Sequence, residues 1–290
     1  MSGRVFGMND LSIKANVRRI LAENGLYPKK NLGQNFLTDA HVLSKIVDAA
    51  DVTADDLIIE VGPGLGVLTT ELAKRAKKVI AIEIDTSMTD ILKYSSPLNA
   101  EIINCDILKA DLRKIIAESG FQSAKIVANL PYYITTPIIF SVLENSLPVS
   151  DLVVMVQKEV AERMLASPST KAYGLLTLSV AYYGKCSLVA NVPPNSFFPR
   201  PDVHSAVVKI HVDEQRHISR SHFFPIIKAA FANRRKTLQN CLAASSELGL
   251  SKEDAARLLA AAFLREDIRG EALAFEDFVR LASIFSISNK

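Results

Sequence analysis

Residues 57–66 read Leu-Ile-Ile-Glu-Val-Gly-Pro-Gly-Leu-Gly, a short apolar run that ends in a turn rich in glycine. The run predicts a buried strand, and residues 67–76 continue with helical spacing. Glycines at such a junction let the backbone approach a ligand at the carboxyl edge of a sheet. An NAD fingerprint would need a glycine where Val67 stands, and no Lys-Ser/Thr pair follows for a phosphate-binding P-loop. A plain tight turn is the alternative reading.

Strand-like and helical stretches alternate in the first half of the chain. Apolar runs predict strands at 57–61, 78–84, 101–105, 125–128 and 152–156, with helices at 86–94, 109–118 and 136–145. Because these strands are continuously apolar, we expect an α/β fold with a mostly parallel sheet covered on both faces. The apolar run 175–190 and the alternating run 203–212, joined by a proline-rich loop, predict an antiparallel hairpin at one sheet edge.

The pattern changes near residue 213 and is helical from there on. Helical spacing recurs at 221–232, 235–246, 251–263 and 275–285. We therefore expect two domains, an α/β domain over residues 1–212 and a small all-helical domain over residues 213–290.

Composition sets the broad class of the protein. The chain has 290 residues, 49% hydrophobic and 22% charged, which is typical of a globular protein with a sizeable core. The formal net charge is +3, and residues 1–40 hold six basic and three acidic side chains, so this N-terminal segment carries the whole excess. Such a basic segment suits contact with phosphates, although a solvated surface would show the same charges.

Cysteine usage and hydropathy indicate the compartment. Cys105, Cys186 and Cys241 lie far apart, and neither a CxxC motif nor a His/Cys cluster occurs, which argues against a disulfide framework and a structural metal. No apolar run approaches the roughly 20 residues that a membrane span needs, and the N-terminus has no hydrophobic signal core. We expect a cytoplasmic protein without a metal or a membrane partner.

Polar side chains follow three of the predicted strands. Glu83, placed 21 positions after Gly62, suits the two hydroxyls of a ribose. Asp106 is suited to accept a hydrogen bond from the amine of an adenine, although taken singly it is more often a helix N-cap. Asn129 follows the fourth strand and adds an acceptor. Together they predict a nucleoside-bearing cofactor without a pyrophosphate fingerprint, which points to S-adenosyl-L-methionine, whose sulfonium cation also suits nearby acceptors.

Residues 129–133, Asn-Leu-Pro-Tyr-Tyr, end the fourth strand on poor strand formers. The N6 amine of adenine is a poor nucleophile because its lone pair is delocalised into the ring. The amide oxygen of Asn129 and the carbonyl of Leu130 are acceptors that can hold its protons and aim the lone pair at a methyl group. Pro131 fixes the turn, and Tyr132 suits stacking on an unpaired base. Alignment and electrostatics then carry the catalysis. The alternative is a capped turn with one core aromatic.

Several longer motifs accompany these residues. They are KKNLGQNFL (29–37), EVGPGLGVLT (60–69), IEID (82–85), NCDIL (104–108), NLPYYI (129–134), FFPRPDVHSAVV (197–208) and FANRRKTL (231–238). Over nearly all of residues 27–290 this set resembles the class I methyltransferases that dimethylate adenosine N6 in ribosomal RNA. The GQNFL and FANRRKTL motifs favour their small-subunit, or KsgA, branch.

The resemblance implies roles for individual residues. The expected cofactor contacts are Asn35, Leu37, Gly62, Glu83, Asp106 and Asn129. The expected catalytic residues are Asn129, Leu130, Pro131, Tyr132 and Phe197, with Phe197 packing on the target base opposite Tyr132. Arg234, Arg235 and Lys236 are expected to contact RNA phosphates, although a basic triplet is also compatible with a solvated face.

The same resemblance implies a fold and an activity. The fold is a Rossmann-like class I methyltransferase domain, residues 1–212, followed by a helical RNA- and ribosome-binding domain, residues 213–290. The activity is transfer of two methyl groups from S-adenosyl-L-methionine to N6 of each of two adjacent adenosines. These lie in a 3′-terminal hairpin of small-subunit (16S) rRNA within a pre-ribosomal small subunit. Three alternatives stay open: a large-subunit rRNA dimethyltransferase of the macrolide-resistance type, a non-catalytic assembly or transcription factor, and an NAD oxidoreductase.

Overall fold

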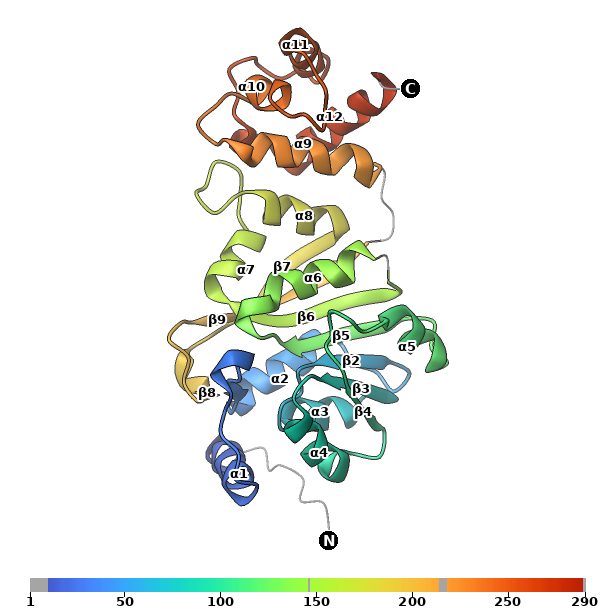
Figure 1. Cartoon of the computed structure of the whole chain (residues 1–290), viewed down its shortest axis with the longest axis vertical. Coiled ribbons are helices and arrows are strands. Elements are labelled where there is room, and N and C mark those ends of the chain that lie inside the picture. Colours follow the sequence, from blue (N-terminus) through green and yellow to red (C-terminus); the bar gives the residue numbers. More distant parts are fainter. Residues whose placement is uncertain (1–9, 146, 214–217, 289–290) are drawn as a thin grey trace. The chain divides into compact units, whose positions relative to one another are not determined.

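The computed structural model describes residues 10–145, 147–213 and 218–288 (Figure 1). Arg4, one cation of the expected basic N-terminal segment, lies outside this range. The chain forms two compact units, residues 1–161 with 187–212 and residues 162–186 with 213–290. Within the described ranges, no helix has the length and apolar character needed to cross a membrane.

The first unit is built on a seven-stranded sheet. Its order is β4 (Ala100–Asn104), β3 (Lys78–Glu83), β2 (Leu57–Val61), β5 (Ala124–Asn129), β6 (Val149–Gln157), β9 (Ser205–Val212) and β7 (Gly184–Val192). The strands from β4 to β6 are parallel, and β9 runs antiparallel to β6. The predicted mostly parallel sheet with an antiparallel edge is therefore confirmed. All five residues of β2 are buried, as expected for a central strand covered on both faces.

Helices and short turns surround this sheet in the first unit. The α-helices are α1 (Asp10–Glu23), α2 (Ala40–Ala49), α3 (Val67–Ala73), α4 (Thr86–Ser95), α5 (Leu112–Glu118) and α6 (Thr135–Glu144), and the 3-10 turns are η1 (Lys30–Leu32), η2 (Tyr132–Ile134) and η3 (Pro194–Ser196). Aspartates cap three of the helices: Asp39 caps α2, Asp85 caps α4 and Asp111 caps α5. Ile13 and Val17 of α1 join one core with side chains of α2, α3 and the sheet.

A second, two-stranded sheet ties together two distant segments. β1 (Phe36–Leu37) runs antiparallel to β8 (Phe197–Phe198), so that Phe36 faces Phe198 and Leu37 faces Phe197. Thr38 extends the contact, because its backbone N–H donates to the Ser196 carbonyl at 2.8 Å. The GQNFL motif and the proline-rich loop are thereby joined, which local periodicity did not predict.

The second unit is helical and starts earlier in the chain than expected. Its helices are α8 (Leu175–Tyr183), α9 (Arg220–Ala232), α10 (Leu238–Ala243), α11 (Lys252–Ala261) and α12 (Phe275–Ser288), with the 3-10 turn η4 (Gly270–Ala272); α7 (Lys158–Met164) spans the boundary. The chain passes from one unit to the other after residues 161, 186 and 212, so the expected boundary at 212/213 is the last of three such points.

Residues 162–186, which we expected in the α/β domain, are grouped with the second unit. Aromatic packing is the physical reason. Tyr182 of α8 stacks on Phe223 of α9 with ring centroids 5.0 Å apart, and it meets Phe224 edge-on at 5.1 Å. The apolar run 175–190 is accordingly a helix followed by strand β7, not a single strand.

Candidate active site

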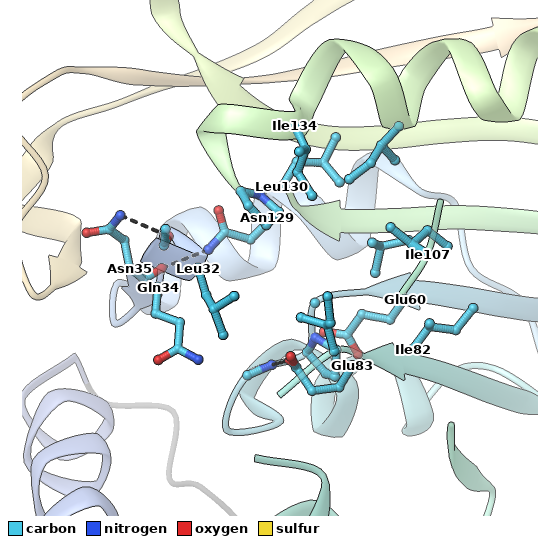
Figure 2. Close-up of a pocket in the computed structure, with 18 of the residues that line it drawn as sticks. Leu32, Gln34, Asn35, Glu60, Ile82, Glu83, Ile107, Asn129, Leu130 and Ile134 are labelled. Carbon is cyan, nitrogen blue, oxygen red and sulfur yellow. Dashed lines mark hydrogen bonds between the residues drawn. The ribbon is translucent and has the colours of Figure 1, made fainter. Parts of the chain in front are cut away.

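A pocket opens at the carboxyl ends of the parallel strands β2, β3, β4 and β5 (Figure 2). Its lining comes from several separate parts of the chain: the segment 32–37, the glycine turn 62–65, residues 82–84 and 105–107, and the turn 129–134. Most of the predicted site residues line this pocket: Asn35, Leu37, Gly62, Glu83, Asp106, Asn129, Leu130, Pro131 and Tyr132. Ligands of open α/β sheets bind at this edge.

The glycine turn forms the floor of the pocket. Gly62 and Gly64 have φ values of 67° and 59°, in the left-handed region that other residues avoid. A side chain at Gly64 would lie 2.9 Å from the Phe36 ring, whereas at Gly62 the nearest atom is the Asn129 carbonyl oxygen, 3.9 Å away. Gly64 therefore allows β1 to pack against the turn, and Gly62 leaves the pocket side of the backbone open.

Glu83 lies at the end of β3 with its carboxylate fixed by backbone donors. Its side chain is buried, and its Oε2 and Oε1 accept hydrogen bonds from Gly64 N at 3.1 Å and Asp85 N at 2.8 Å. Burial raises the pKa of Glu83, and these two bonds oppose the rise. An oriented carboxylate oxygen has further lone pairs, and these suit the two hydroxyls of a ribose.

A partly buried ion pair holds the GQNFL motif beside Glu83. Asp85 accepts from Lys29 Nζ at 2.7 Å and from Gln34 Nε2 at 2.8 Å, and Gln34 Oε1 accepts from Lys29 N at 2.8 Å. Burial disfavours the Asp85 carboxylate, yet these bonds outweigh burial and lower the pKa of Asp85. Sequence reasoning missed this arrangement, although a second acid in Ile-Glu-Ile-Asp was a visible signal.

The side-chain amide of Asn129 has a fixed orientation. Its Nδ2 donates to the Asn35 carbonyl at 2.9 Å, so its oxygen is turned the other way (Figure 2). Leu130 N donates to the Met155 carbonyl of β6 at 3.2 Å, and the Pro131 carbonyl accepts from Thr135 Oγ1 at 3.0 Å. The turn is thus held from two sides, which pre-organises the acceptors expected from the sequence.

The two aromatic residues assigned to the target base differ in their surroundings. Tyr132 lines the pocket, and its hydroxyl forms a 2.6 Å hydrogen bond with Ser205 Oγ of β9. Burial raises the pKa of this phenol. Phe197 is 1% exposed, does not line the pocket and pairs with Leu37 across the small sheet. In this structure Phe197 is a core residue outside the pocket lining, and its packing on the target base opposite Tyr132 stays a prediction.

Asp106 lines the pocket and holds a turn rather than capping a helix, and its contact with an adenine amine stays a prediction. Its Oδ1 accepts from Leu108 N at 3.0 Å, which fixes a turn after β4, while the residue also lines the pocket. Tyr133, which the sequence reasoning left without a role, lines the same pocket and is 55% exposed. Gly33 packs beside the Tyr133 ring, and its φ of 63°, in the left-handed region, favours a glycine there.

Glu60 was also missed, although it stands directly before the glycine turn. It lines the pocket, is 1% exposed, and its Oε2 is buried without a hydrogen-bond partner in the protein. Burial raises the pKa of Glu60 to about 8. The Glu60 Oε2 atom has no hydrogen-bond partner in the protein and lies in the pocket lining near the glycine turn. It therefore fits a ligand with cationic groups, as S-adenosyl-L-methionine has. Within the described residues, no group of three metal-ligating side chains is assembled.

The basic triplet of the second unit is divided between two roles. The Arg234 guanidinium donates to Glu271 at 2.9 and 3.1 Å, to the Lys171 carbonyl at 2.7 Å and to the Thr170 carbonyl at 3.1 Å. Arg234 therefore clamps the segments around it, and its contact with RNA phosphates stays a prediction. Arg235 and Lys236 are exposed.

A family model for ribosomal RNA adenine dimethylase matches residues 26–281. The chain belongs to this ribosomal RNA adenine dimethylase family. It is 48% identical over 263 residues to the ribosomal RNA small subunit methyltransferase A of Lachnoclostridium phytofermentans, with 88% of this chain and 91% of the relative covered. The protein of the same name from Clostridioides difficile is 44% identical, with 96% and 98% covered.

Solved structures show the same fold. A dimethyladenosine transferase from Plasmodium falciparum has a TM-score of 0.74 and 28% identity over 88% of this chain and 98% of its own. The 23S rRNA methyltransferase ErmE has a TM-score of 0.67 at 24% identity, over 87% and 100% of the two chains, and supports the fold alone. The Rossmann-like class I architecture is confirmed.

Proposed function

We propose that this protein transfers methyl groups from S-adenosyl-L-methionine to N6 of two adjacent adenosines in a 3′-terminal hairpin of small-subunit rRNA. The product is N6,N6-dimethyladenosine, and the proposed setting is a pre-ribosomal small subunit in the cytoplasm. The observation that carries the proposal is the fixed Asn129 amide, whose donor is held by Asn35 at 2.9 Å and whose oxygen is left as an acceptor. The names of the relatives support the small-subunit substrate.

The pocket residues divide into cofactor and substrate groups. Glu83 and Asp106 would hold the nucleoside of the cofactor, and Glu60 would face its cationic part beside Gly62. When bound, S-adenosyl-L-methionine supplies an electrophilic methyl group. Glu83, Asp106 and Glu60 would orient the cofactor. The apolar part of the pocket lining, which includes Ile82, Ile107 and Leu130, would exclude water.

The turn 129–132 would act on the target base. The Asn129 oxygen and the Leu130 carbonyl would accept hydrogen bonds from the N6 amine, which favours a pyramidal nitrogen with its lone pair directed at the methyl group. Tyr132 stacks on the base, and the Ser205 hydroxyl keeps the tyrosine in place. No strong base is required, because the nitrogen becomes acidic once it is alkylated.

RNA contacts outside the pocket are assigned to Arg235 and Lys236. Both are exposed, unlike the clamped Arg234. Changing both to Ala should weaken rRNA binding and lower its salt slope by up to about two charges, without altering cofactor affinity. An unaltered slope would assign them to a solvated face.

Methylation assays on separate rRNAs test the proposal. Purified protein is incubated with S-adenosyl-L-methionine and small-subunit rRNA, small-subunit particles or large-subunit rRNA, and nucleosides are analysed by mass spectrometry. We expect N6,N6-dimethyladenosine in small-subunit RNA, and Asn129→Ala, whose methylation rate should be about a hundredfold lower, is the matched control. Dimethylation of large-subunit RNA instead would support the macrolide-resistance type. Absence of product from every substrate would overturn the proposed activity.

A further inference from the structure

An aromatic residue of the second unit occupies a backbone position that normally belongs to glycine. Phe263 follows α11 and has φ of +57°, in the left-handed region. Its N–H donates to the Ala260 carbonyl and the Leu264 N–H donates to the Leu259 carbonyl, each at 3.0 Å, which is the hydrogen bonding of a helix C-terminal cap. A β-carbon at such a position strains the backbone, and a large side chain offsets this strain only if its ring makes contacts.

The ring of Phe263 makes few contacts within the chain. The residue is 91% exposed, so it contributes almost nothing to the core. Its backbone is nevertheless fixed, because Arg280 Nε donates to the preceding Ala262 carbonyl at 2.9 Å. The structure thus presents a solvent-exposed phenyl ring on a hydrogen-bonded backbone, at a place where glycine would be both less strained and less apolar.

The segment that carries this ring lies beside the exposed cations already described. Leu238 N donates to the Ile268 carbonyl at 2.7 Å, which brings the residues after Lys236 alongside the loop 264–269. In the loop itself the Arg265 guanidinium pairs with Asp267 at 3.3 Å, so the positive charge beside this segment comes from Arg235 and Lys236. Positive charge and a flat apolar ring therefore occur on neighbouring segments of the same unit.

We propose that Phe263 stacks on an unpaired base of the RNA that the second unit binds. This inference rests on the proposed function, because it needs an RNA substrate. Single-stranded RNA is bound by aromatic rings that stack on bases and by cations that contact the phosphates between them. Exposed Arg235 and Lys236 supply the cations, and Phe263 supplies the platform, which makes no hydrogen bonds and so accepts any base.

Two substitutions test the stacking role. Phe263→Gly removes the ring and relieves the strain, so it should raise the melting temperature by about 2 °C. It should also weaken binding to small-subunit rRNA by about tenfold. Its salt slope should equal that of the wild type, because no charge is lost. Phe263→Trp should keep the affinity, since indole also stacks.

The tryptophan variant gives a direct signal because the natural chain contains no tryptophan. Stacking on a base should quench its fluorescence when rRNA is added. The matched control is Tyr94→Trp, since Tyr94 is an equally exposed aromatic, 92%, on the first unit; its fluorescence should not change.

Three results would overturn the inference. They are wild-type affinity in Phe263→Gly, an unquenched indole in Phe263→Trp on saturating RNA, and a loss of affinity seen with small-subunit particles but not with naked rRNA, which would indicate a protein contact. Methylation by the wild type on the same RNA separates this failure from failure of the proposed function. If the wild type dimethylates the RNA and the indole of Phe263→Trp stays unquenched, only the proposed role of Phe263 is overturned, and the proposed function stands.

Discussion

Replacing Lys29 with Met should destabilise the cofactor site through a residue that does not line the pocket. Lys29 Nζ lies 2.7 Å from Asp85 Oδ1, and the Asp85 side chain is only 1% exposed. In the variant, a buried carboxylate keeps Gln34 and loses its cation. The segment 29–37 would then be held less firmly, and it carries Asn35 and Leu37.

The size of the effect follows from the burial of the two partners. A hydrogen bond to a charged group contributes roughly 1.5–3 kcal/mol. The Lys29 side chain is 41% exposed and therefore partly screened, so we expect the lower end, about 1.5 kcal/mol. A carboxyl whose folded pKa is lowered contributes stability above its unfolded pKa of 3.8 and loses it as the pH falls. The difference between wild type and variant should thus be largest near pH 7 and shrink below about pH 4.

Urea unfolding of wild type and Lys29→Met at several pH values measures this difference, and calorimetry measures cofactor affinity. We expect a severalfold loss of affinity in parallel with the loss of stability. Lys30→Met is the matched control, because Lys30 is the exposed neighbour on the same segment. Equal stability of Lys29→Met and wild type at pH 7, or a difference that does not depend on pH, would refute the reasoning.

Four further outcomes follow from the pocket. Asn129→Ala should slow single-turnover methylation at saturating cofactor by about a hundredfold with little change in RNA affinity; full activity would contradict the acceptor role. Tyr132→Phe and Ser205→Ala each remove one partner of the same hydrogen bond, so each should lower activity a few-fold and the double variant should lower it no further. Additive losses would show that the two hydroxyls have separate roles. Glu83→Ala should weaken S-adenosyl-L-methionine binding by about one to two decades in calorimetry, and unchanged affinity would exclude Glu83 from the site. Burial raises the pKa of Glu60 from 4.5 to about 8, so this carboxyl lowers stability as the pH rises through that interval. Glu60→Gln should flatten the decline in melting temperature between pH 5 and 8, and an unchanged slope would show that Glu60 is ionised in the fold.

Local patterns were sufficient for the sheet and for the main polar residues of the pocket. The apolar runs predicted β2, β3 and β5, because a strand buried on both faces must be continuously apolar whatever its neighbours are. The carboxyl ends of parallel strands meet at one edge, so Glu83 and Asn129 were predicted to share a site before their contacts were known.

Burial and hydrogen-bond partners depended on the tertiary structure. Phe197 was predicted to pack on the target base, and its burial and its pairing with Leu37 became apparent only in the tertiary structure. The sequence does not distinguish Arg234 from its two basic neighbours, whereas in the structure its guanidinium donates to Glu271 and to two backbone carbonyls. Helical spacing predicted the helices after position 212, but only the tertiary structure groups Tyr182 with them, where its ring stacks on Phe223. Sequence pattern reports how a residue's neighbours along the chain are arranged, whereas the partners that bury a ring or neutralise a charge come from segments far away in sequence, which only folding brings together.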